Sequence, residues 1–131
     1  MARRKSRESG ADDFEEDARG LNLVVLQGQL SSDPVTRELP SGEEVVNLEV
    51  TTPTGLGRLS VPVVTDPVNL DLHAGREVVV VGHVRRRFFR AGAGVQSRTE
   101  VVAETILLSS QVARIRRAFD DAVEYLATPR A

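Results

Sequence analysis

The side chains best suited to chemistry lie together between positions 85 and 98. Guanidinium groups bind phosphate through paired N–H donors and stack on flat rings, and aromatic rings stack on exposed bases. No acidic residue falls inside this window. The window therefore predicts a surface for an anionic ligand, with nucleic acid as the best fit; a solvated arginine-rich hairpin is the alternative. The residues concerned are Arg85, Arg86, Arg87, Phe88, Phe89, Arg90 and Arg98.

The bulk composition limits the other possibilities. A chain of 131 residues has the length of a single domain and can bury a core. Its 17 basic and 19 acidic side chains give a formal net charge of -2, so any attraction for a polyanion must come from a local cluster. The chain has no cysteine, which excludes disulfides, thiolate metal sites and cysteine nucleophiles.

Residues 1–19 are polar and charged, with a basic block before the acidic block DDFEED, and predict a disordered arm. The arm either touches nucleic acid through its basic residues or only improves solubility. We expect no secretory signal, because the arm lacks an apolar segment. We expect no membrane span either, because no apolar run approaches about 18 residues. The basic residues of the arm are Arg3, Arg4, Lys5 and Arg7.

From Leu21 onward, short valine-rich runs alternate with turn residues and predict an all-β domain over residues 20–110. Asp66, Pro67 and Gly75 carry the boundary signals of a short helix within residues 65–75. Five strands with a short helix between the third and fourth follow the order of an OB-fold, a five-stranded Greek-key barrel. The predicted strands are residues 21–30, 44–52, 58–64, 76–90 and 95–109.

Residues 111–127 predict an added C-terminal amphipathic helix, followed by a tail at 128–131. The apolar stripe of this helix packs against the barrel or against a second copy of the chain, and the spacing allows both. The stripe consists of Val112, Ile115, Phe119, Ala122 and Leu126.

Three stretches of the chain resemble bacterial single-stranded DNA-binding proteins. They are residues 19–50, with Asp33-Pro34 and Gly28 in the order and spacing of that family, residues 75–90, and residues 98–108. The resemblance implies an OB-fold that binds single-stranded DNA, or RNA, without sequence preference or cofactor. It also implies assembly into homodimers or homotetramers and a cytoplasmic, nucleoid-associated place in replication, recombination or repair.

The chain departs from this family in several features. It contains no tryptophan, Leu59 stands where a stacking aromatic is expected, and the loop at 53–57 is short. The family's acidic tail is replaced by the predicted helix and the residues TPRA. These differences indicate an atypical or accessory member. They also leave open a second function, an OB-fold module that binds another protein.

Strand alternation places Arg85, Arg87 and Phe89 on one side of the fourth predicted strand. The resemblance matches Phe89 to a stacking tryptophan, so this side is the predicted DNA face. Arg86, Phe88, Arg90 and Arg98 are secondary candidates, and Arg58 and Arg37 are weaker ones carried over from the resemblance. Alternatively, Phe88 and Phe89 pack beneath the hairpin or at a subunit contact.

The same strand continues toward its N-terminal end with a different character. Val79 and Val81 share the predicted DNA face although they are apolar, so we expect a second subunit or the C-terminal helix to cover them. Val78, Val80 and Val84 are expected to point into the barrel.

Other chemistry finds little support. His73 and His83 have no ligand partners at metal-binding spacing, so no metal site is expected. The glycines at 55–57 and 92–94 lack the lysine and helix of a phosphate loop. No combination of residues predicts an enzyme, a cofactor or a small-molecule substrate.

Overall fold

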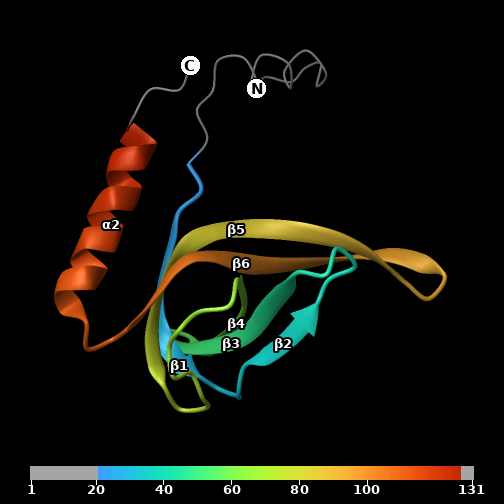
Figure 1. Cartoon of the computed structure of the whole chain (residues 1–131), viewed down its shortest axis with the longest axis horizontal. Helices are drawn as coiled ribbons and strands as arrows, with labels where there is room; N and C mark the ends of the chain where they lie inside the picture. The colour runs from blue at the N-terminus through green and yellow to red at the C-terminus, as the bar shows by residue number, and fades with distance from the viewer. Residues whose placement is uncertain (1–20, 128–131) are drawn as a thin grey trace.

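The computed structural model describes residues 21–127, with side chains described as far as Glu124. Within this range the chain forms six strands and one C-terminal helix (Figure 1). The predicted charged arm and the tail at 128–131 lie outside the described residues. The elements are β1 Val24–Leu30, β2 Val35–Glu38, β3 Glu44–Thr54, β4 Gly57–Thr65, β5 Glu77–Ala91, β6 Gly94–Leu108 and α2 Val112–Ala127.

Five of the strands close into a barrel. The sheet order is β1-β5-β6-β4-β3-β2, and an additional pairing of β1 with β3 joins its two sides. This pairing sets Leu30 opposite Val50. The contact of β4 with β6 is parallel and the others are antiparallel. The closed five-stranded barrel is confirmed, and it is consistent with the expected OB-fold.

β2 is an element that the sequence pattern did not predict. It pairs only with β3, so it lies at the edge of the sheet. All four of its side chains are exposed. A strand without a buried side has no apolar alternation, which explains why its sequence reads as part of a turn.

The predicted short helix between the strands now labelled β4 and β5 is absent, because residues 66–76 form bends and a turn. Leu70 and Leu72 both pack against the core from this segment. Backbone N–H groups of this segment form hydrogen bonds with other parts of the chain. The N–H of Gly75 donates to the carbonyl of Leu30 at 2.7 Å, and the N–H of Ala74 donates to the Asp33 carboxylate at 2.8 Å. Tertiary contacts thus replace the bonds that a helix would have made.

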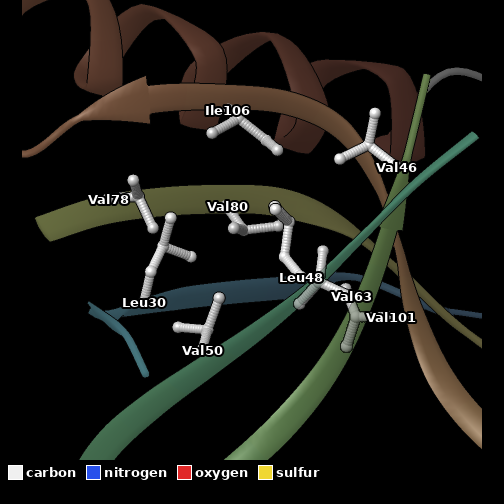
Figure 2. Packing of buried hydrophobic residues seen from close by; sticks show 9 residues of the cluster. All are labelled: Leu30, Val46, Leu48, Val50, Val63, Val78, Val80, Val101 and Ile106. Atoms are coloured by element: carbon white, nitrogen blue, oxygen red, sulfur yellow. The ribbon is translucent and has the colours of Figure 1, made fainter. Parts of the chain in front are cut away.

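The core lies inside the barrel and consists mainly of alternate residues from the five barrel strands (Figure 2). Val78 and Val80 of β5 are fully buried there, as strand alternation predicted. Val84 lies on the same side of β5 but is 42% exposed, because β1 begins at Val24, opposite Gly82, and does not reach it. The central cluster is Leu30, Val46, Leu48, Val50, Val63, Val78, Val80, Val101 and Ile106.

A β-bulge interrupts the pairing of β5 and β6 close to the place where they leave the barrel. Val81 pairs with Thr105 but Gly82 pairs with Ala103, so Glu104 is the extra residue on β6. The backbones come very close at this point. A Cβ built on Gly82 would lie 1.9 Å from the carbonyl oxygen of Val102. Only glycine fits this position without moving a strand.

Within the described part of the chain, no helix combines the length and the apolar character that crossing a lipid bilayer requires.

We predict that Gly82→Ala lowers the free energy of unfolding by about 3 kcal/mol or more, because overpacking against the backbone forces the two strands apart. Urea denaturation measures this change. The matched control is Gly55→Ala, where nothing lies within 4 Å of the added Cβ. Equal stability of the two variants would contradict the close approach at Gly82.

Candidate nucleic-acid interface

The hairpin of β5 and β6 extends beyond the barrel on the side away from α2 (Figure 1). Its strands pair continuously from the bulge to Ala91 and Gly94. A two-residue turn, Gly92 and Ala93, joins them, and Gly92 has a φ of 62°. Such a turn matches the twist of the two strands and fixes their register.

This register decides which side chains share a side of the hairpin. Arg85 lies opposite Glu100, Arg87 opposite Arg98, and Phe89 opposite Gln96. We call the side that carries these six residues the outer face, because it is opposite to the side that enters the core. The structure thus brings Arg85, Arg87, Phe89 and Arg98 together. Arg86, Phe88 and Arg90 lie on the other side, opposite Thr99, Ser97 and Val95.

Glu100 is the residue that organises the outer face, although the sequence pattern did not single it out. Its side chain is only 1% exposed, beneath the arginines that bind it. Its Oε2 accepts a hydrogen bond from Nη2 of Arg85 at 2.6 Å and from Nε of Arg87 at 3.2 Å. Its Oε1 lies 3.7 Å from Nε of Arg98. One buried carboxylate therefore holds three of the predicted arginines.

The pKa of Glu100 reflects opposing effects. Burial raises the pKa of a carboxyl, but the hydrogen bonds and positive charges of Arg85 and Arg87 together outweigh burial and lower it below the ordinary value. Glu100 is therefore ionised at neutral pH. It offsets one of the three positive charges around it.

The two phenylalanines have different surroundings. Phe89 is half-buried, and the guanidinium carbon of Arg87 lies 5.3 Å from the centre of its ring, within cation–π range. Phe88 is 65% exposed on the other side of the hairpin. Arg87 therefore bridges Glu100 and Phe89 and fixes the position of both the charge and the ring.

A hollow of about 370 Å³ lies beside this cluster, lined by residues of β3, β4, β5 and β6 and of the region around β2. Arg37 of β2 lies on its wall together with Arg85 and Arg87. Arg58 does not. It lines a separate hollow with Gln27, Thr52 and other residues.

Toward the barrel, the outer face of β5 becomes apolar and covered. Val79 and Val81 are each 3% exposed. Val81 lines a groove together with Ala118 and Ala122 of α2, which places the C-terminal helix beside this end. This placement follows one of the two predicted arrangements, and it needs no second subunit for Val81.

The apolar stripe predicted for α2 is divided in the structure. Ile115 and Ala122 are half-buried, whereas Val112 and Phe119 are 61% and 42% exposed. The side chain of Leu126 lies outside the described residues. α2 therefore packs on the barrel through one part of its apolar surface and leaves another part open.

Asn22 belongs to the stretch of residues 19–50 that resembles the family, and the structure gives it a role that the sequence did not predict. Its side-chain oxygen accepts from the backbone N–H of Val84 at 2.9 Å, and its side-chain nitrogen donates to the carbonyl of Val84 at 2.8 Å. Both partner atoms belong to Val84, which lies on β5 just beyond the bulge. Asn22 thus ties the segment before β1 to the base of the hairpin.

The comparisons with known proteins cover little of the chain. No protein-family model matches the sequence. The chain is 53% identical over 38 residues to Single-stranded DNA-binding protein 1 of Chlorobaculum tepidum. The matched part is 29% of this chain and 24% of the relative, so the likeness is local.

We predict that Glu100→Gln destabilises the fold by about 1–3 kcal/mol at neutral pH, because charge-assisted hydrogen bonds to the arginines are weakened. The folded-state pKa of Glu100 is lowered, so its contribution is complete above the unfolded pKa of about 4.3 and is lost as the pH falls through the folded value. Urea denaturation from pH 7 to pH 3 measures both effects.

The variant should therefore lose less stability on acidification than the wild type does. Glu43→Gln is the control, since Glu43 is exposed and forms no ion pair among the described residues. If Glu100→Gln and Glu43→Gln gave the same pH profile, the role assigned to Glu100 would be wrong.

Proposed function

We propose that this protein binds single-stranded DNA through the outer face of its β5–β6 hairpin, with little sequence preference. The observation that carries the proposal is the fixed group formed by Arg85, Arg87 and Phe89 on one face of a barrel hairpin. The name of the Chlorobaculum tepidum relative supports the same ligand. The mechanism combines phosphate capture by guanidinium groups with base stacking on a phenylalanine ring.

The ion pairs with Glu100 do not remove the arginines from the site. A guanidinium has five N–H donors, and Arg85 and Arg87 each use one on Glu100. Three guanidiniums against one carboxylate leave two net positive charges. The remaining donors are free for phosphate oxygens, and the carboxylate limits the side-chain entropy that binding has to remove.

The other predicted residues contribute less directly. Arg37 faces the arginine pair across the hollow and reaches the same strand of DNA. Phe88, Arg86 and Arg90 act from the other side of the hairpin, as secondary contacts near its tip. Arg58 lies apart and belongs to the site only if the DNA wraps around the barrel.

The wider role is that of an atypical or accessory OB-fold member of the bacterial single-stranded DNA-binding protein family. It acts in the cytoplasm, at the nucleoid, in replication, recombination or repair. It needs no cofactor or metal, turns over no small-molecule substrate and is not an enzyme. RNA is a second ligand of the same chemistry, since every base has a face for stacking.

A second candidate function is an OB-fold module that binds protein, and one observation favours it. Val112, Phe119 and Val123 are exposed along α2 at spacings that place them near one another on the helix. Such a stripe is typical of a helix that meets a partner. We propose a second copy of the chain as that partner, in a homodimer or homotetramer.

For the DNA site, we predict that labelled oligothymidylate binds in fluorescence anisotropy titrations with an affinity that falls as salt rises. Three to five phosphate contacts give a slope of log K against log salt of roughly -2 to -3.5. The combined change Arg87→Ala with Phe89→Ala should weaken binding about tenfold or more, since one stacked ring contributes about 1–3 kcal/mol.

Val95→Ala is the control for this measurement. Val95 is 67% exposed on the same hairpin and carries neither charge nor ring. Binding that survives the double change would place the site elsewhere. A wild-type protein that does not bind at low salt would exclude the proposed function.

For the assembly, we predict that the chain is larger than a monomer in light scattering and that Phe119→Arg reduces its mass. The substitution puts a charge into the exposed stripe, where a partner copy would have to bury it. Ala113→Arg, which adds the same charge at an exposed position of α2 outside the stripe, is the control. An unchanged mass for Phe119→Arg would reject α2 as the contact.

A further inference from the structure

A groove of about 730 Å³ lies between α2 and the outer side of β5 and β6. Its floor is apolar, with Val81, Leu107 and Ala118. Two arginines of the helix, Arg114 and Arg117, line its wall. Neither the sequence pattern nor the hairpin site accounts for these arginines.

The groove lies next to the hairpin site along the same strand. Proceeding from Phe89, the outer face of β5 carries Arg87, Arg85 and then His83. His83 lines the groove, and its cross-strand partner Val102 lines the hollow that contains Arg85 and Arg87. The two sites therefore adjoin. From Phe89 to Val81 the strand covers roughly 26 Å, a path long enough for several nucleotides.

The charges of the groove favour an anionic ligand at the helix wall. Arg114 and Arg117 form no ion pair with another described residue. Two acidic residues also line the groove. Glu104 is hydrogen-bonded to Nδ1 of His83 at 3.0 Å, and Asp121 lies one turn beyond Arg117 on the helix. Glu104 belongs to the strand side of the groove, so on the helix wall the two arginines stand beside one carboxylate, that of Asp121.

We propose that the bound single strand continues from the hairpin into this groove, where Arg114 and Arg117 contact its phosphates and the apolar floor receives a base. The proposal rests on the function proposed above and extends the site to α2. The helix then has two roles on different sides: it completes the nucleic-acid path and carries the stripe of Val112, Phe119 and Val123. A protein segment that occupies the groove is the competing outcome.

The test compares single substitutions on one helix. Arg114→Gln and Arg117→Gln should each weaken oligothymidylate binding about two- to fivefold at moderate salt. Each should also flatten the salt slope by roughly 0.7, the value for one phosphate that is no longer neutralised. Arg116→Gln is the matched control, because Arg116 is exposed on the same turn and does not line the groove. Arg116→Gln changes the net charge by the same amount, at a position that the bound single-stranded DNA does not reach.

A change of opposite sign separates a binding role from a structural one. Asp121→Asn removes the repulsive carboxylate and should strengthen binding, which a loss of packing would not do. The length dependence gives a second measure. The affinity of the double variant Arg114→Gln with Arg117→Gln should stop rising at a shorter oligothymidylate than that of the wild type. Circular dichroism on every variant checks that α2 stays folded.

Wild-type binding with equal effects of Arg117→Gln and Arg116→Gln, and no increase for Asp121→Asn, would overturn the proposal but leave the hairpin site in place. That result would favour a protein segment as the occupant of the groove. A wild type that does not bind the oligonucleotide at any salt concentration would reject both the hairpin site and its extension.

Discussion

The close approach of β5 and β6 at Gly82 is the constraint on which the rest of the structure depends. β1 pairs with β5 as far as Gly82, and β4 pairs with β6 at Val101 and Val102, just beyond the bulge. Past these residues β5 and β6 pair only with each other and form a hairpin. The bulge at Glu104 lets the pair change direction without giving up its ladder. A side chain at position 82 would collide with the carbonyl of Val102. The absence of a Cβ at this position therefore allows the two strands to approach closely where they turn out of the barrel.

The hairpin also shows how a cluster of like charges can be stable before it meets a ligand. Three arginines on one face would repel one another and lose much side-chain entropy on binding. Glu100 beneath them reduces the repulsion and fixes their side chains. Arg87, held by Glu100, in turn fixes the ring of Phe89 through a cation–π contact. The carboxylate also lowers the net positive charge of this face by one unit. The site is therefore more ordered but less cationic than its sequence indicates.

The C-terminal helix gives the outer face a second wall. α2 shelters Val81, which would otherwise be an apolar residue on a solvated surface, and in doing so creates the groove with Arg114 and Arg117. The same helix leaves Phe119 exposed on another side. The proposed path of nucleic acid and the proposed contact between copies therefore lie on different sides of one short element.

Local pattern by itself determined the strands, the barrel and the side of β5 on which Arg85 and Phe89 lie, because alternation and turn residues act over a few positions. The same local reasoning failed for residues 66–76, where bonds to Leu30 and Asp33 overrule the helix signals. It also missed β2, which buries nothing. The pairing of Arg85 with Glu100 could have been predicted from the sequence, by placing the two-residue turn at Gly92 and matching residues outward from it along the two strands. Only the tertiary structure decided that this carboxylate is buried, that Arg37 lines the same hollow as Arg85 and Arg87 while Arg58 lines another, and that α2 lies along β5. Each of these depends on contacts between distant parts of the chain.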